Sequence, residues 1–211
     1  MKKTAILVLA LGVLIASPSF AQIANGSFEW LGGSYLGWHA TIPPGASIEI
    51  VGSHVSDLGN IYLPVDGDYF ALIKTDGPGS ITTLSTTFNL QPGLYLEGWA
   101  AFDARDYLPF NDRAFVKIKN LAGNVIGLPY FQSVTSVGSY GDGPWTRWTW
   151  APPEPGLYTV ELGARNDLDS ILDSYGLFDA HAAVPEPGSL LLLGSGLIGL
   201  AAAYRIRRKK K

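Results

Sequence analysis

The chain has 211 residues, 47% of them hydrophobic, with 15 Lys and Arg against 18 Asp and Glu and a net charge of −3 at pH 7. It has no cysteine, which excludes disulfides and thiolate metal sites. Eight of the basic residues lie in the two terminal segments, so residues 22–183 keep 7 Lys and Arg against 17 Asp and Glu, a net charge near −10. A surface this acidic excludes nucleic acid and anionic lipid as partners of this part.

The N-terminal segment has the pattern of a secretory signal peptide. Two lysines precede the apolar run Ala5–Ala16, and small residues at Ser19 and Ala21 occupy the −3 and −1 positions of a cleavage site. We therefore predict a signal peptide over residues 1–21, cleaved after Ala21. An uncleaved N-terminal anchor is the alternative.

Residues 22–183 are long enough for one domain with a real core. Alternating apolar and polar residues predict short strands, which Gly, Pro and Asp separate, at 47–51, 69–73, 94–100, 114–118, 145–150, 157–162 and 175–180. The best helical candidate, 167–172, is one or two turns. The prediction is an all-β fold, a two-sheet jelly-roll sandwich, between a signal peptide and a C-terminal transmembrane tail.

Three segments of this domain resemble the galactose-binding-like jelly roll of carbohydrate-binding modules. They are the opening Asn25-Gly26-Ser27-Phe28-Glu29 with Trp38 after it, the strand Gly67-Asp68-Tyr69-Phe70-Ala71-Leu72, and the last strand Ser174-Tyr175-Gly176-Leu177-Phe178-Asp179. The resemblance implies a fold shared by many functions, and so it does not identify a ligand.

The same resemblance implies a structural Ca²⁺ that joins the first and last strands. Its ligands would be Glu29 and Asp179, with a carbonyl near Gly26 and a contribution from Asp68. Carboxylates and carbonyls are the oxygen ligands that Ca²⁺ takes. The alternative is that Glu29 and Asp179 are polar strand ends. A second acidic cluster, 166–173, lacks the glycine and distal Glu of an EF-hand loop, so we interpret it as a solvated loop.

Sugar binding would need exposed aromatic side chains. On one strand, Trp148 and Trp150 share a face and Trp145 lies on the other, so Trp145 is one candidate for display. Trp30, Tyr35 and Trp38, which lie in a Gly-rich loop, are the other candidates. Buried packing is the alternative for each tryptophan.

The loop 103–113 is the place where we expect a ligand first, because binding sites favour loops on a rigid scaffold. Its candidate residues are Asp103, Arg105, Asp106 and Tyr107. The alternative is that the paired charges of this loop only hold it in place.

The sequence shows no catalytic motif, and we predict no catalytic residue. The three histidines are isolated, and no metal-ligand spacing appears among them. Asp103 and Asp106, or Glu97 and Asp103, are the carboxylate pairs that a glycosidase could use. With 17 carboxylates in the domain, such spacings occur by chance. A secreted glycoside hydrolase is the alternative to a non-catalytic protein.

The C-terminal segment 184–211 has three parts. Pro185-Glu186-Pro187 disfavours a regular helix or strand, the apolar run 190–203 follows, and six Lys and Arg close the chain at 205–211. As a helix the run spans about 22 Å, short of the ~30 Å bilayer core. The basic end would stay in the cytoplasm.

This arrangement resembles the PEP-CTERM sorting signal of Gram-negative bacteria, whose mark is the triplet at Pro185, Glu186 and Pro187. The resemblance implies processing by an exosortase-type membrane transpeptidase. We therefore expect an exported protein that the tail first holds in the inner membrane and that reaches the cell surface or the extracellular matrix after processing. Its partner there would be extracellular polysaccharide. An ordinary uncut membrane anchor is the alternative.

Overall fold

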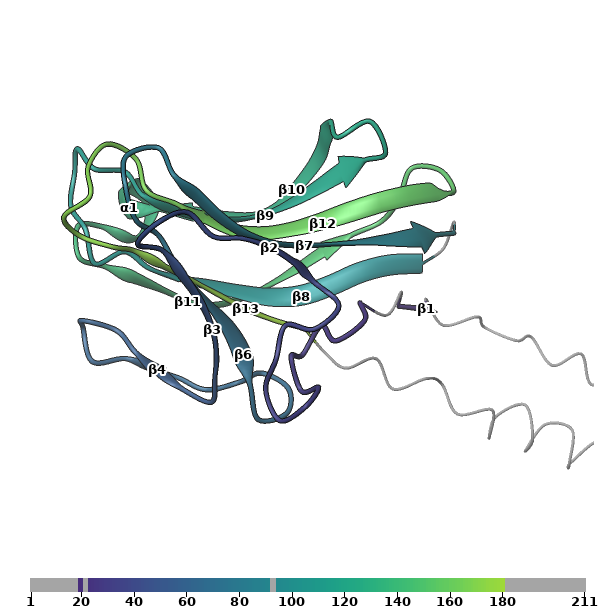
Figure 1. Cartoon of the computed structure of the whole chain (residues 1–211), viewed down its shortest axis with the longest axis horizontal. Coiled ribbons are helices and arrows are strands. Elements are labelled where there is room, and N and C mark those ends of the chain that lie inside the picture. The colour runs from purple at the N-terminus through teal and green to yellow at the C-terminus, as the bar shows by residue number, and fades with distance from the viewer. Residues whose placement is uncertain (1–18, 21–22, 92–93, 181–211) are drawn as a thin grey trace, which may run out of the picture.

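The computed structural model describes residues 19–20, 23–91 and 94–180 as two sheets packed face to face (Figure 1). In spatial order, the first sheet contains β1 (Ser19–Phe20), β8 (Leu94–Asp103), β13 (Tyr175–Asp179), β6 (Phe70–Lys74) and β3 (Ser47–Val51), and β11 (Asp142–Trp150) also pairs with β8. The second sheet contains β10 (Val125–Ser133), β9 (Arg113–Asn120), β12 (Gly156–Arg165), β7 (Ile81–Leu90) and β2 (His39–Thr41). All these pairs are antiparallel except β1 with β8.

The chain passes repeatedly between the two sheets. From β6 to β13 each strand lies in the sheet opposite to the previous one, apart from the hairpin of β9 and β10. This confirms the predicted all-β jelly-roll sandwich. The described residues contain no helix long and apolar enough to span a membrane. The predicted sorting tail, and the predicted signal peptide apart from residues 19–20, lie outside the described residues.

The predicted helical turn at 167–172 is wrong, because this segment is an irregular loop. The helix that the described residues do contain is the single turn α1 (Val134–Val137). In the loop, the Asp167 backbone N–H donates to the Asp112 carboxylate at 2.8 Å, and the Asn166 amide donates to the Leu172 carbonyl at 3.4 Å. Such side-chain bonds compete with the helical backbone pattern.

The main core fills the space between the sheets. Alternate residues of each strand point inward, and the buried side chains include Phe28, Leu84, Leu90, Leu96, Phe102, Val116, Ile118, Val160 and Phe178. Apolar burial at about 25 cal/mol per Å² is therefore the main stabilising term in this cysteine-free chain.

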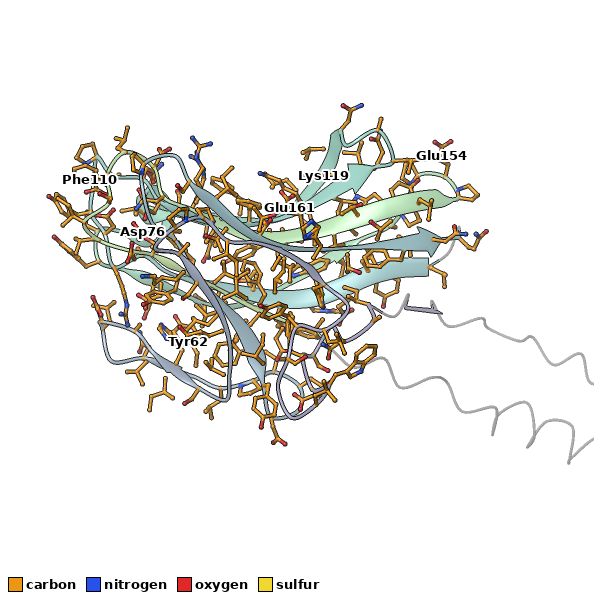
Figure 2. The ribbon with its side chains drawn as sticks, in the orientation of Figure 1. Tyr62, Asp76, Phe110, Lys119, Glu154 and Glu161 are labelled. Atoms are coloured by element: carbon orange, nitrogen blue, oxygen red, sulfur yellow. The ribbon has the colours of Figure 1, made fainter. Side chains whose placement is uncertain are left out.

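A hairpin of β4 (His54–Val55) and β5 (Ile61–Tyr62) covers part of the outer face of the first sheet, at the place labelled Tyr62 in Figure 2. A second buried cluster lies there and contains Tyr62, Phe70, Leu72, Ala101 and Leu177. The Tyr62 hydroxyl donates to the Gly143 carbonyl at 2.8 Å. The hairpin is thus bound to the sheet and closes this part of its face to a ligand.

Candidate ligand-binding pocket

The loop between Phe28 and Trp38 is shaped by one buried amide. Asn25 is 5% exposed, and its Nδ2 donates to the carbonyls of Ser34 at 2.7 Å and Leu36 at 3.0 Å. Its Oδ1 accepts the Trp30 N–H at 3.1 Å. Asn25 has φ 51°, a left-handed conformation that asparagine tolerates better than most residues. This side chain, together with backbone bonds such as the Ser34 N–H to the Phe28 carbonyl at 3.0 Å, holds the shape of a loop without regular structure.

Trp38, a predicted ligand-binding residue, belongs to the wall of this loop. Its indole N–H donates to the Asn25 carbonyl at 3.1 Å, and its ring stacks on Phe28 with centroids 5.6 Å apart. It is 9% exposed. Trp38 is thus mainly a packed residue, with a small exposed part that contributes to the pocket beside it.

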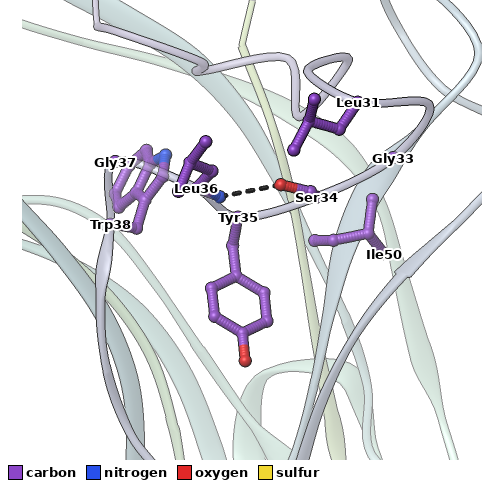
Figure 3. A pocket seen from close by; sticks show the side chains of 8 residues that line it. All are labelled: Leu31, Gly33, Ser34, Tyr35, Leu36, Gly37, Trp38 and Ile50. Atoms are coloured by element: carbon purple, nitrogen blue, oxygen red, sulfur yellow. Dashed lines mark hydrogen bonds between the residues drawn. The ribbon is translucent and has the colours of Figure 1, made fainter.

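A pocket of about 450 Å³ opens between this loop and β3 (Figure 3). Its lining residues are Leu31, Gly33, Ser34, Tyr35, Leu36, Gly37, Trp38 and Ile50. Tyr35 is partly buried and packs against the core between the sheets, and in Figure 3 its ring points away from the side chains of Leu31, Ser34 and Leu36. The Ser34 hydroxyl accepts the Leu36 N–H at 3.0 Å. The pocket offers one phenol ring, aliphatic walls and few polar groups, which suits a ring-shaped ligand with an apolar face.

The sequence indicated only part of this pocket. Tyr35 and Trp38 were candidates because aromatic residues in a Gly-rich loop are typical of ligand contacts. Leu31 and Leu36 are 85% and 56% exposed, and nothing in the sequence except their hydrophobicity indicated that they would line a pocket. Ile50 comes from β3, and only the fold brings it to the loop.

The predicted loop site at Asp103 and Arg105 is a buried ionic network. Asp103 is 1% exposed, and its Oδ2 accepts the Arg105 Nε–H at 2.8 Å and lies 2.8 Å from His54 Nε2. Arg105 Nε also lies 3.2 Å from Asp57 Oδ1, and the guanidinium covers the Tyr175 ring at 4.8 Å. These contacts attach the β4–β5 hairpin to the end of β8. They match the alternative that the charges hold the loop in place.

Asp106 and Tyr107, the other predicted residues of this loop, differ in exposure. Asp106 is 0% exposed, its Oδ1 accepts the Tyr107 N–H at 2.7 Å, and burial raises its pKa. Tyr107 is 39% exposed and stacks on Tyr140 with centroids 5.5 Å apart. Phe110 meets Tyr107 edge-on at 5.3 Å. Tyr107 is therefore the most exposed of the four predicted loop residues, and no pattern in the sequence indicated its partner Tyr140.

Trp145, a third aromatic candidate, packs under the β4–β5 hairpin. Its ring meets Phe70 edge-on at 5.4 Å and Tyr62 at 6.2 Å, and its indole N–H donates to the Leu63 carbonyl at 2.9 Å. Trp148 is 3% exposed in the core between the sheets. The two tryptophans thus lie on opposite faces, as the alternation predicted.

The predicted calcium residues hold one loop through its backbone. Asp179 Oδ2 accepts the N–H groups of Val65 at 2.6 Å and Asp66 at 3.1 Å. Glu29 Oε1 accepts those of Asp68 and Tyr69, both at 2.9 Å. Asp179 is 3% exposed, and burial raises its pKa to about 7.

These carboxylates have N–H donors, so the loop is held without a metal ion. Gly26, the fourth predicted residue, donates its own N–H to the Ile23 carbonyl at 3.0 Å. In the described part of the chain, no three His, Cys, Asp or Glu residues gather in an arrangement that could hold a metal ion by themselves. Ca²⁺ at Glu29 and Asp179 stays a prediction, tested with a chelator.

Asp103 and Asp106, a carboxylate pair that a glycosidase could use, are only 1% and 0% exposed. A glycosidase needs both carboxyl groups beside the scissile bond. A substrate cannot reach this pair, so a secreted glycosidase would have to use other residues.

Several solved structures are similar to the chain at low identity. One is the module TmCBM61 in complex with β-1,4-galactotriose, with 16% identity, a TM-score of 0.46, and coverage of 77% of this chain and 96% of that one. Another is the C-terminal family 22 carbohydrate-binding module of Clostridium thermocellum Xyn10B, with 15% identity, a TM-score of 0.39, and coverage of 78% of this chain and 99% of that one. A third is the K1 cleaved adhesin domain of Lys-gingipain from Porphyromonas gingivalis W83, with 12% identity, a TM-score of 0.40, and coverage of 69% of this chain and 92% of that one. No curated protein sequence matches the chain.

The family comparison concerns the C-terminal segment. Residues 183–209 match the family model of the PEP-CTERM protein-sorting motif. The match includes Pro185, Glu186 and Pro187, the triplet on which the prediction rested, and such a motif indicates export. The chain therefore carries a PEP-CTERM sorting motif at residues 183–209.

Proposed function

We propose that this is an exported, non-catalytic protein of the cell surface or extracellular matrix, and that its domain binds extracellular polysaccharide in the Tyr35 pocket. The observation that carries the binding proposal is the pocket of about 450 Å³, with Tyr35 and Trp38 among its lining residues. It is built on a loop that Asn25 holds in one shape. A preformed pocket loses little entropy when a ligand binds.

The chemistry of the pocket fits a neutral sugar. A pyranose ring has an apolar C–H face, which packs on an aromatic ring, and a rim of hydroxyls for hydrogen bonds. The net charge near −10 over residues 22–183 repels acidic polymers. Neutral hexose and pentose polymers are therefore the expected class, and uronate polymers are disfavoured.

A polysaccharide panel tests binding and separates it from hydrolysis. The full-length protein, purified in mild detergent, is run in native gels that contain neutral or uronate polymers, and reducing ends are assayed in parallel. We expect retardation by at least one neutral polymer with no reducing ends released. Release of reducing ends would favour the secreted glycoside hydrolase, and unchanged mobility in every gel would remove the binding proposal.

For the sorting step, we propose that an exosortase-type membrane transpeptidase processes the chain at Pro185-Glu186-Pro187. Each proline fixes its own φ and disfavours helix at the residue before it, so the triplet presents an extended backbone to an enzyme. The apolar run 190–203 would hold the motif at the inner membrane, and the basic end 205–211 would stop further export. After processing, the domain would reach the cell surface or matrix.

A triple substitution tests this step. Replacing Pro185, Glu186 and Pro187 by alanine should leave export intact but make the unprocessed chain accumulate in the inner membrane. Deletion after Ala183 is the matched control, and it should give a soluble, folded domain because β13 ends at Asp179. Membrane fractionation and intact mass give the readout. Processing of the triple variant like the wild type would leave only an ordinary membrane anchor.

A further inference from the structure

Two loops at one end of the sandwich contain buried oxygen atoms that no donor reaches. Asp106 Oδ2, Asn166 Oδ1 and Asp169 Oδ1 are buried and have no hydrogen-bond partner among the described residues. Asp106 and Asn166 are each 0% exposed. A buried acceptor without a partner costs about 1–3 kcal/mol, and more if it is charged. Asp173 Oδ1, in the same loop as Asn166 and Asp169, is a fourth such atom, although Lys74 pairs with the other oxygen of that carboxylate. The buried oxygens of these two loops therefore need a partner.

The contacts of these residues place them together. The Asn166 Nδ2 donates to the Leu172 carbonyl at 3.4 Å, so the amide lies across the turn that contains Asp169. The Asp167 N–H donates to Asp112 Oδ1 at 2.8 Å, which attaches this turn to the end of the 104–112 loop. Asp106 lies in the same 104–112 loop, where its carboxylate is fully buried and only its Oδ1 has a hydrogen-bond donor, the Tyr107 N–H.

The basic side chains nearby are paired with other carboxylates. Arg113 and Arg165 lie 3.3 Å and 3.7 Å from Asp167 Oδ1, and Lys74 lies 3.0 Å from Asp173 Oδ2. Within the described ranges, Asp106 and Asp169 form no ion pair with any of them. The missing positive charge is therefore not supplied by the side chains around the two loops.

We propose that Asp106, Asn166 and Asp169 form a Ca²⁺ site that joins the 104–112 and 166–173 loops. Ca²⁺ takes six to eight oxygen ligands from carboxylates, amides, carbonyls and water, and it tolerates irregular geometry, whereas Mg²⁺ requires a near-ideal octahedron. Two carboxylates and an amide oxygen supply part of this set. Backbone carbonyls and water complete it.

This site differs from the one predicted at Glu29 and Asp179, whose carboxylates accept backbone N–H groups from residues 65–69. It also has a consequence for the surface. Asp106 Oδ1 accepts the Tyr107 N–H, so an ion on Asp106 steadies the exposed stack of Tyr107 on Tyr140.

The test uses full-length protein in detergent that carries Glu29→Gln, which weakens the other predicted site. Tb³⁺ luminescence, sensitised by nearby tyrosines such as Tyr107, and the Ca²⁺ dependence of the melting temperature are measured. In this background we expect Ca²⁺ to raise the melting temperature and to displace Tb³⁺. Adding Asp169→Asn should weaken Ca²⁺ binding at least tenfold. Asp57→Asn, a change at an exposed carboxylate, should leave it unchanged.

Asp106→Asn is the second variant and should give the same loss as Asp169→Asn. Asp169 is only partly buried, so its variant is expected to fold even where Asp106→Asn does not. Failure of the Glu29→Gln protein to bind Ca²⁺ or Tb³⁺ would overturn the proposal, as would unchanged affinity in Asp169→Asn. Stability that rises on acidification and ignores Ca²⁺ would also overturn it, because a proton on Asp106 would then be the missing partner.

Discussion

Glu29 and Asp179 lie 150 positions apart in the sequence, and their carboxylates hold the same five-residue loop. Asp179 accepts the backbone N–H groups of Val65 and Asp66. Glu29 accepts those of Asp68 and Tyr69. Gly67, between the two pairs, has φ 73°, and a Cβ atom there would lie 2.3 Å from Glu29 Oε1. Only glycine fits this position without displacing the carboxylate. The loop therefore depends on two carboxylates and one glycine.

Loss of either carboxylate should destabilise the domain. Glu29→Gln removes charge-assisted hydrogen bonds, and Asp179→Ala removes the buried acceptor of two N–H groups; each should lower the free energy of unfolding by about 1–3 kcal/mol in urea titrations. The double variant should lose less than the sum, because both residues hold one loop. Glu49→Gln, at an exposed carboxylate of β3, is the control. Strict additivity of the two changes would contradict a shared loop.

A Ca²⁺ ion at the same loop would add a separate contribution. In protein that carries Asp169→Asn, a chelator should then lower the melting temperature, and Asp179→Ala should abolish this effect. Linkage gives about 2.7 kcal/mol of stabilisation when free Ca²⁺ is 100 times its dissociation constant. A melting curve that the chelator leaves unchanged would remove Ca²⁺ from Glu29 and Asp179.

The two acidic partners of Arg105 should contribute differently to stability. Asp103 is 1% exposed and accepts hydrogen bonds inside the network, whereas the Asp57 side chain is 52% exposed. Asp103→Asn should therefore lower the free energy of unfolding by about 2–3 kcal/mol, and Asp57→Asn by less than about 0.5 kcal/mol. Equal effects of the two substitutions in chemical denaturation would refute the network as a stabilising element.

Stability should fall as pH rises through the range set by Asp112. Burial raises its pKa from 3.8 to about 6, so between pH 4 and 6 the folded state binds more protons than the unfolded chain. The unfolding free energy must therefore decrease across this window, by about 3 kcal/mol at most from this group. Asp106 and Asp179 contribute with the same sign. Asp112→Asn should flatten the profile in the presence of a chelator, and an unchanged slope would contradict the assignment to Asp112.

Strand prediction succeeded where apolar and polar residues alternate. Residues 47–51 form β3 with the predicted bounds. β7 was missed because threonine and serine fill half of its ten positions, so few apolar residues reveal the alternation of a strand. β10 was missed because it contains Gly127 and Pro129 and has shifts in register, which an edge strand tolerates.

The candidate sites were harder to predict because they depend on contacts between distant segments. The sequence indicated the 103–113 loop, but Asp103 is closed off by His54, 49 residues earlier, on a hairpin that was not predicted. The pocket needs Ile50 of β3 against the 31–38 loop. The sorting motif, in contrast, can be recognised from local sequence alone, and the family match at 183–209 confirms it.

Binding of an oligosaccharide at Tyr35 tests the central claim most directly. Isothermal titration with fragments of the polymer that retards the protein compares the wild type with Tyr35→Ala and with Tyr107→Ala, which changes an exposed aromatic residue outside the pocket. Loss of a stacking ring in the pocket should weaken affinity at least tenfold in Tyr35→Ala, because aromatic contacts carry much of the energy of such sites. Tyr107→Ala should bind like the wild type. Wild-type affinity in Tyr35→Ala would contradict the account.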